Sequence, residues 1–166
     1  MSSHDEKLLD DIGWRLLEEL QEDARLSYTE LGRRVGLSTP AVMERIHKME
    51  DAGIIMGYRA EVSPEKIGFQ VTAFIRIGLK HEVLPRLDSL FKEIPEIVEC
   101  HRVTGADSLI LKVHVTSIAH LETVIQRITP YGMPATSIVL STPAPRRRLD
   151  RQMVAQAAKK TRGSQS

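Results

Sequence analysis

The chain has 166 residues, enough for one domain or two small ones. Lys and Arg number 23 against 22 Asp and Glu, which excludes a strongly basic or acidic protein, so a nucleic-acid partner would have to be bound by local charge. Hydrophobic residues make up 42%, typical of a globular chain, whereas aromatic residues make up only 4%, which disfavours a surface built for base stacking.

The single cysteine, Cys100, excludes a disulfide within the chain and disfavours a cysteine-based metal site. It fits the reducing cytoplasm, where we expect the protein to act. The first residues, MSSHDEK, are polar and acidic, so we expect no signal peptide. No apolar run approaches the roughly 20 residues that a membrane span requires, and we expect no membrane partner.

Two helices are predicted first in the chain. Apolar residues recur at helical spacing over residues 3–20, which predicts a helix there. The sequence SYTE, starting at Ser27, is a candidate capping box that opens a second, shorter helix. Gly36 is expected to end that helix in a tight turn. Acidic residues outnumber basic ones over residues 1–60, and several of them lie in the first predicted helix.

A third helix is predicted directly after that turn. Ser38 or Thr39 is its expected N-cap, and Gly53 is expected to end it. Pro40 lies in its first turn, where the missing N–H group costs little. Three apolar residues at helical spacing form its predicted buried stripe: Val42, Ile46 and Met49. Residues 54–62 then predict a short strand with a glycine break, so residues 1–60 predict three helices followed by a strand or wing.

Residues 61–68 contain proline and glycine and are predicted to form a linker. The second half of the chain, which follows it, has a different pattern of apolar residues. Residues 69–142 predict strands in FQVTAFIRIGL, IVECHRVT, LILKVHV and ATSIVLS, helices in EVLPRLDSLFKEI and SIAHLETVIQRI, and a turn in PYGMP. The order is that of a ferredoxin-like βαββαβ domain, so the fold class is α+β. The basic tail, residues 143–166, is expected either to be disordered or to form a weak helix.

Two short helices joined by a glycine-containing turn predict a helix-turn-helix, whose second helix enters the major groove of DNA. The helix N-terminus also points backbone N–H groups at a phosphate. The predicted DNA-binding residues are Arg33, Ser38, Thr39, Pro40, Met43, Arg45, His47 and Lys48. Each has a plain alternative: the hydroxyl residues serve as caps alone, and the others form a solvated helix face. Arg45 would then pair with Glu44 or Asp51 instead of a phosphate.

These residues resemble the helix-turn-helix of the Lrp/AsnC family, the feast/famine transcriptional regulators. The matching residues are Leu37-Ser38, Pro40, Val42, Arg45, Gly53-Ile54-Ile55 and Gly57-Tyr58, joined by the spacing to the second half and the sequence VTGADSLILKV. The resemblance covers roughly residues 5–142. It implies double-stranded DNA binding modulated by a small molecule, commonly an amino acid, without catalysis. It also implies a winged helix-turn-helix DNA-binding domain over residues 1–60. The second half would be a ferredoxin-like effector and oligomerisation domain, which pairs sheet to sheet in a homodimer that assembles into tetramers or octamers.

The family's effector site lies between subunits, around the loop that joins the second and third strands. Here that loop is Thr104, Gly105, Ala106, Asp107 and Ser108. Gly105 permits close approach of a ligand to the backbone, and Asp107 would receive an ammonium group. The alternative is an ordinary turn between strands, which suits Gly and Asp equally well. Many members place the acidic residue one position later, where this chain has Ser108.

Two other functions compete with this one. An architectural protein that coats DNA with little sequence choice would use the basic tail and show a steep salt dependence with a small specificity ratio. A siroheme decarboxylase of the same architecture would need a tetrapyrrole-binding region rich in His, Tyr, Asn and Trp in its second half, and the only tryptophan here is Trp14. No His-based metal motif or Ser–His–Asp set can be assembled, so we expect no metal, no cofactor and no enzyme.

Overall fold

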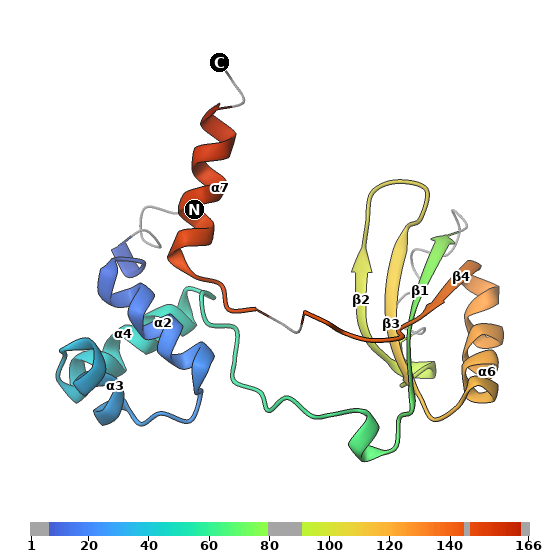
Figure 1. Cartoon of the computed structure of the whole chain (residues 1–166), viewed down its shortest axis with the longest axis horizontal. Helices are drawn as coiled ribbons and strands as arrows, with labels where there is room; N and C mark the ends of the chain where they lie inside the picture. Colours follow the sequence, from blue (N-terminus) through green and yellow to red (C-terminus); the bar gives the residue numbers. More distant parts are fainter. Residues whose placement is uncertain (1–6, 80–90, 145–146, 164–166) are drawn as a thin grey trace. The chain divides into compact units, whose positions relative to one another are not determined.

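The computed structural model describes residues 7–79, 91–144 and 147–163, and the chain divides into two units (Figure 1). The first unit comprises Met1–Ala60 together with Ala144–Ser166, and the second comprises Glu61–Pro143. The chain therefore leaves the first unit at residue 60 and returns to it at residue 144. No helix among the described residues is long and apolar enough to cross a membrane.

Helices α2 (Asp11–Glu22), α3 (Tyr28–Val35) and α4 (Thr39–Asp51) share one hydrophobic core in the first unit. The core side chains come from all three helices: Leu16, Leu20, Leu31, Val35, Val42 and Ile46. The helix predicted over residues 3–20 is interrupted, because residues 7 and 8 are helical, residues 9 and 10 are not, and α2 begins at Asp11. Asp10 is the N-cap of α2 and accepts the N–H of Gly13 at 2.8 Å. An N-cap residue has a non-helical backbone, so the helix begins only at the next residue.

The predicted strand over residues 54–62 is also wrong, since this segment forms no strand. The segment contains β-branched residues that favour a strand, but no other strand pairs with it among the described residues. Strand propensity without such pairing does not form a strand. Gly57 adopts a φ of 142°, a conformation that other residues rarely take. Tyr58 instead fastens the segment to α4, donating from its hydroxyl to the Glu50 carboxylate at 2.9 Å.

The second unit is built on a four-stranded sheet in the order β2-β3-β1-β4, with antiparallel neighbours. Its described elements in chain order are η1 (Glu65–Ile67), β1 (Val71–Leu79), β2 (Ile97–Arg102), β3 (Leu109–Val115), α6 (Ile118–Ile128), η3 (Thr129–Tyr131) and β4 (Gly132–Ile138). This confirms the predicted α+β class. The helix predicted over residues 82–94 lies mostly outside the described residues, with residues 91–93 helical. Strand β4 starts inside the predicted PYGMP turn, three residues earlier than predicted.

The alternation of strand side chains gives the sheet two different faces. On one face, Ala73, Ile75 and Ile77 of β1 are fully buried beside the equally buried apolar residues of β3. Helix α6 packs on this face through Leu121, Val124 and Ile128. On the opposite face, Phe74 of β1 is 40% exposed.

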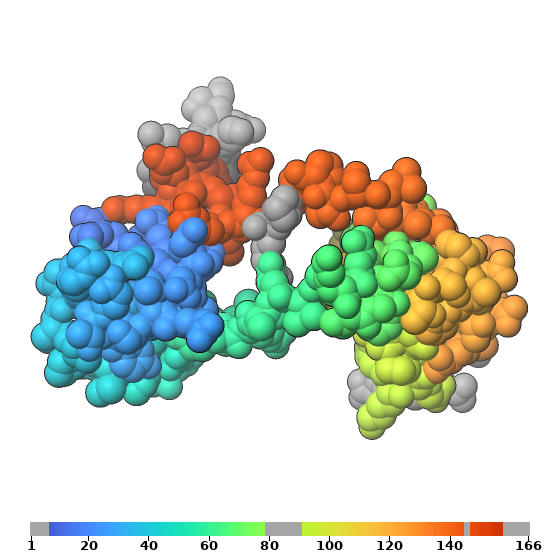
Figure 2. All heavy atoms as spheres, turned by 60° about the horizontal axis from the view of Figure 1, so that its bottom comes forward, coloured from blue at the N-terminus to red at the C-terminus, as the bar shows by residue number. Residues whose placement is uncertain are grey.

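The basic tail, for which disorder and a weak helix were the two expectations, forms helix α7 (Arg151–Gly163). The side chain of Asp150 accepts the N–H of Met153 at 2.9 Å, an N-cap contact at the start of this helix. The tail lies against α2 within the first unit (Figure 2). The Gln21 side chain bonds the backbone of Leu149 there.

Candidate nucleic-acid interface and effector loop

The turn between α3 and α4 has little conformational freedom. Helix α3 begins as predicted, with the Ser27 hydroxyl accepting the N–H of Glu30 at 3.2 Å. It ends at Gly36, whose φ of 79° lies in the left-handed region, and the Leu37 N–H donates to the Gly32 carbonyl at 2.9 Å. A side-chain carbon added at Gly32 would lie 2.4 Å from the Leu37 carbonyl oxygen. Two glycines thus fix the direction in which α4 leaves the turn.

Helix α4 has one buried and one exposed side, as its apolar spacing predicted. Val42, Ile46 and Met49 are fully buried and hold the helix in the unit. The predicted contact residues Met43, His47 and Lys48 are exposed. The exposed side is broad enough to face a partner while the buried stripe holds the helix in place.

The N-terminal end of α4 is open to solvent. Ser38 is its N-cap, but the hydroxyl makes no capping hydrogen bond. Thr39 and Pro40 in the first turn are also exposed, and the Thr39 hydroxyl lies 3.3 Å from that of Thr29. A helix N-terminus carries partial positive charge, so this end is suited to an anion.

Two predicted contact residues on α4 already have partners within the unit. The Lys48 ammonium group lies 2.6 Å from the Glu44 carboxylate one turn earlier, and both are more than half exposed. The His47 ring meets Tyr28 edge to face with centroids 6.4 Å apart. Exposed ion pairs of this kind contribute little to stability because water screens them, so Lys48 can exchange its partner at little cost.

Arg45 behaves differently from its neighbours. Its two terminal nitrogens donate to both oxygens of Asp10 at 2.7 and 2.6 Å, and its side chain is only 28% exposed. The hydrogen bonds from Arg45 are the main cause that lowers the pKa of Asp10 below its usual value. The partner is thus a carboxylate, though neither Glu44 nor Asp51, and the contact joins α4 to the cap of α2. DNA contact by Arg45 stays a prediction.

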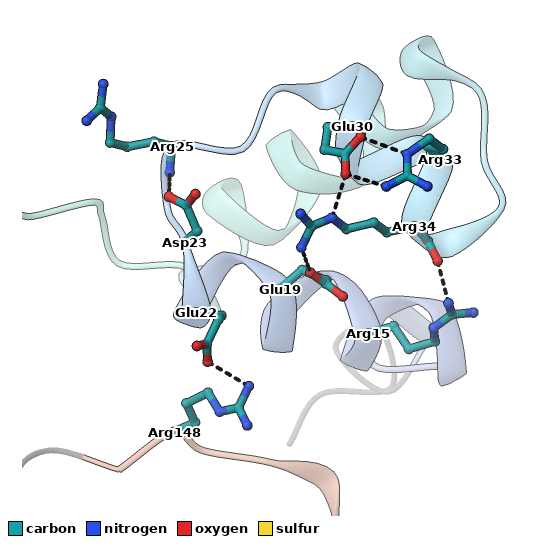
Figure 3. A network of polar contacts seen from close by, with 9 residues as sticks. All are labelled: Arg15, Glu19, Glu22, Asp23, Arg25, Glu30, Arg33, Arg34 and Arg148. Atoms are coloured by element: carbon teal, nitrogen blue, oxygen red, sulfur yellow. Dashed lines mark hydrogen bonds and ion pairs between the residues drawn. The ribbon is translucent and has the colours of Figure 1, made fainter.

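Arg33 and Arg34 belong to a polar network between α2 and α3 (Figure 3). Arg34 bridges the two helices, since its guanidinium group lies 2.6 Å from Glu19 and 2.8 Å from Glu30. Arg33 also binds Glu30, at 2.7 Å, and Arg15 donates to the carbonyl of Arg34. The two guanidinium groups lower the pKa of Glu30 to about 2. Arg33 remains 72% exposed, so it can still face a phosphate.

This network was not predicted from the sequence, which assigned Arg33 to DNA binding and no ion-pair partner to either arginine. Glu19 lies 15 residues before Arg34, and no local pattern joins residues on separate helices. An acidic residue three or four positions before an arginine is a local signal, and Glu30 supplied it.

The predicted effector loop is a defined turn between β2 and β3. The Val103 N–H donates to the Ser108 carbonyl at 3.1 Å, and the Ser108 N–H donates to the Ile77 carbonyl of β1 at 2.8 Å. Gly105 has a φ of 114°, and a side-chain carbon added there would meet nothing within 4 Å. Glycine is therefore needed for the backbone conformation at this position, and space remains around it.

Asp107 has a cationic partner on the sheet. Its carboxylate lies 3.8 Å from the guanidinium group of Arg76 on β1, and both side chains are at least one-third exposed. Thr104, Gly105 and Ala106 are exposed beside it. An incoming ammonium group would have to share Asp107 with Arg76 or replace it. Ligand contact by the loop stays a prediction.

One face of the sheet carries exposed apolar side chains. The register pairs Phe74 with Ser137 and Gly78 with Met133, which places Phe74 and Met133 on the same face. Their exposed fractions are 40% and 84%. Exposed apolar side chains gathered on one face mark a surface that another protein can cover.

The described part of the chain offers little support for a metal-binding site or a nucleophilic cysteine. There, no three His, Cys, Asp or Glu side chains are grouped to hold a metal ion. Cys100 is half-buried on β2, and burial raises the pKa of its thiol, which disfavours the reactive thiolate.

Comparison with known proteins gives two family matches. The AsnC-type helix-turn-helix domain matches residues 9–50, and the Lrp/AsnC ligand binding domain matches residues 72–149. The transcriptional regulator LrpC of Bacillus subtilis is 36% identical over 133 residues, which cover 80% of this chain and 92% of LrpC.

Solved structures agree with these matches. The structure of Bacillus subtilis LrpC covers 83% of this chain and 99% of its own, with 35% identity and a TM-score of 0.78. A feast or famine regulatory protein from Mycobacterium tuberculosis, complexed with L-methionine, covers 86% of this chain and 99% of its own, at 33% identity and a TM-score of 0.78. A Neisseria meningitidis transcriptional regulator in complex with L-methionine covers 88% of this chain and 99% of its own, at 26% identity and a TM-score of 0.80.

Proposed function

Since the chain belongs to the Lrp/AsnC family of transcriptional regulators, we propose that it is a sequence-specific DNA-binding regulator, acting in the cytoplasm and controlled by an amino acid. The single observation that carries this proposal is the two-sided character of α4. Its buried stripe fixes it in the first unit, while its N-terminal end and opposite side are exposed. A helix held in this way can enter a major groove without disturbing its own core.

We assign the DNA contacts by their position on α3 and α4. Ser38 and Thr39 lie at the N-terminal end of α4, where their hydroxyl groups and the free backbone N–H groups can bind a phosphate, and Pro40, which has no N–H, lies exposed beside them. Exposed residues farther along α4 face the base edges: Met43, His47 and Lys48. Arg33 at the end of α3 is placed for a flanking phosphate. Arg45 positions α4 through its bonds to Asp10, and DNA contact by the same guanidinium group stays a prediction.

The second unit supplies assembly and control in this proposal. The exposed apolar face with Phe74 and Met133 pairs with the same face of a second copy, giving a homodimer that can assemble further. Two α4 helices then read successive major grooves, and the operator is a pseudo-palindrome.

The effector binds at the loop Thr104–Ser108, between subunits, and changes DNA affinity or assembly by binding one state more tightly than the other. L-methionine is the first amino acid to test, because related structures contain it. In this assignment the effector's ammonium group meets Asp107, which competes with Arg76 for the same carboxylate.

The testing experiment measures binding of the purified protein to its own upstream DNA against a scrambled duplex of the same length. Fluorescence anisotropy at two salt concentrations, with and without a panel of amino acids, gives a specificity ratio and a ligand effect. We expect at least a roughly thousandfold preference for the upstream DNA, as for specific regulators, and a change with one amino acid. Tight binding without preference or ligand effect would favour an architectural protein.

Matched variants connect the result to α4. Lys48→Ala removes a charge on the proposed contact side, and Lys92→Ala removes an exposed charge from the second unit. We expect Lys48→Ala to weaken operator binding roughly tenfold, and Lys92→Ala to leave it unchanged. Equal binding by both variants would remove Lys48 from the contact set.

A further inference from the structure

The C-terminal tail is fastened to α2 by consecutive residues. The backbone N–H and C=O of Leu149 both bond the Gln21 side-chain amide, each at 2.9 Å. On one side of this clip, Arg148 lies 3.0 Å from Glu22. One amide group thus satisfies both backbone groups of one residue, which fixes the register of the tail along α2.

The next two residues continue the contact and start the tail helix. Asp150 caps α7 through the N–H of Met153, and Arg151 pairs with Asp11 near the start of α2. We call residues 148–151 the anchor. Its ion pairs are each more than half exposed and therefore weak, so the Gln21 clip makes the anchor specific.

The tail changes the charge balance of the first unit. Residues 1–60 contain 12 Asp and Glu against 8 Lys and Arg, an excess that opposes approach to DNA. Residues 144–166 contain 7 Lys and Arg against 1 Asp, so the complete unit has 15 basic and 13 acidic residues. The anchor also pairs two of the exposed acidic residues on α2, Asp11 and Glu22.

The sequence of helix α7 is basic along its length and contains no acidic residue. Its basic residues are Arg151, Lys159, Lys160 and Arg162. Only the first of them belongs to the anchor, and the other three follow in the second half of the helix. The match to the ligand binding domain ends at residue 149, before α7 begins. A helix whose charged residues are all basic complements the phosphate backbone, and phosphate contacts carry no sequence information by themselves.

We propose that α7 is a second DNA-binding element, which contacts the phosphate backbone irrespective of sequence and is held to the helix-turn-helix unit by the anchor. This inference rests on the proposed function, because α4 must first bring the unit to DNA. Once it does, the anchor keeps α7 at a high effective concentration near the duplex, so that its contacts add to those of α4.

The test removes, in the full chain, the three basic residues in the second half of α7. The variant with Lys159, Lys160 and Arg162 each changed to Gln is compared with the parent on the upstream and scrambled duplexes over a salt series. We expect affinity for both duplexes to fall by the same factor and the specificity ratio to stay unchanged. Each phosphate that the variant no longer neutralises makes the slope of log affinity against log salt shallower by about 0.9, so three make it shallower by up to about 2.7.

Two further variants separate charge from anchoring. In the control variant, three exposed basic residues of the second unit are changed to Gln: Lys66, Lys92 and Arg102. We expect its slope of log affinity against log salt to equal that of the parent. Gln21→Ala keeps every charge but removes the clip, and is expected to weaken binding to both duplexes with little change in slope. Thermal unfolding and circular dichroism check that each variant keeps its fold.

The outcomes distinguish the two proposals. If the parent chain binds neither duplex, the proposed function fails. If the parent binds and the tail variant keeps its affinity and slope, only the role of α7 is overturned. If the tail variant has a shallower slope but Gln21→Ala binds like the parent, α7 binds DNA without the anchor, and the anchoring half of the inference is overturned.

Discussion

Asp10 joins two helices through one carboxylate, so its loss should cost more stability than an ordinary surface substitution. It caps α2 through the N–H of Gly13 and holds both terminal nitrogens of Arg45 on α4. Loss of an N-cap costs about 1 kcal/mol. The ion pair adds about 0.5–1 kcal/mol, because Asp10 is 42% exposed and the pair is screened by water. Asp10→Ala should therefore lower the free energy of unfolding by about 2 kcal/mol.

The assay is urea unfolding followed by the fluorescence of Trp14, which lies on α2 and reports on the first unit. Asp10→Asn is the matched variant, since asparagine caps a helix as well as aspartate but carries no charge. We expect it to cost only about 0.5–1 kcal/mol. If Asp10→Ala and Asp10→Asn both unfold within about 0.3 kcal/mol of the parent, the carboxylate does not join the helices as described.

The pH dependence gives an independent check. Arg45 lowers the pKa of Asp10 in the folded state, so the ion pair stabilises the fold above the unfolded pKa of about 4 and is lost as pH falls through the lower folded value. The difference between the parent and Asp10→Asn should shrink below about pH 4. Arg45→Ala tests the other partner. If this variant binds the operator as tightly as the parent at a temperature where both are fully folded, Arg45 is removed from the predicted DNA contacts.

Three further changes test the interior and the turn of the first unit. Ile46→Ala should cost about 2–5 kcal/mol because the side chain is fully buried, whereas Met43→Ala on the exposed side of α4 should stay within about 0.5 kcal/mol; equal costs in urea unfolding would contradict the two-sided helix. Gly32→Ala should destabilise the turn and abolish operator binding, because the new carbon would meet the Leu37 carbonyl; parent-like binding would show that the turn can relax. Glu30→Gln should lower the melting temperature at pH 7 but lose this effect as pH falls from about 4.5 to about 2, since the folded pKa of Glu30 is depressed and its stabilisation disappears in acid.

Elements specified by local patterns could be predicted from the sequence. The buried stripe of α4, the Ser27 cap, the Gly36 turn and the alternating strand β1 each depend on residues close together in the chain. The start of α2 could not be found by apolar spacing, because Leu9 and Ile12 continue the pattern across the Asp10 cap. The strand predicted over residues 54–62 was wrong for the opposite reason. Its residues favour a strand, but a strand also needs a partner strand to pair with.

The candidate site shows the same division. Spacing along α4 indicated its exposed side, but the partners of the exposed residues depend on separate elements. Arg45 binds Asp10, which lies 35 residues away, and Asp107 faces Arg76 on another strand. The anchor is the extreme case, since Gln21 and Leu149 are 128 residues apart. Opposite charge in the tail and in α2 was visible in the sequence, whereas the clip that joins them was not.

The order of the chain has a consequence for the newly made protein. Helices α2, α3 and α4 leave the ribosome first, and the anchor follows only after the whole second unit has been made. At roughly 5–20 residues per second, the helices wait about 5–20 s before the anchor arrives. During that interval Asp11 and Glu22 lack their partners in the anchor, and the acidic excess of residues 1–60 opposes approach to DNA. With the proposed role of α7, a new chain reaches its full affinity for DNA only when the last segment of the first unit has been made.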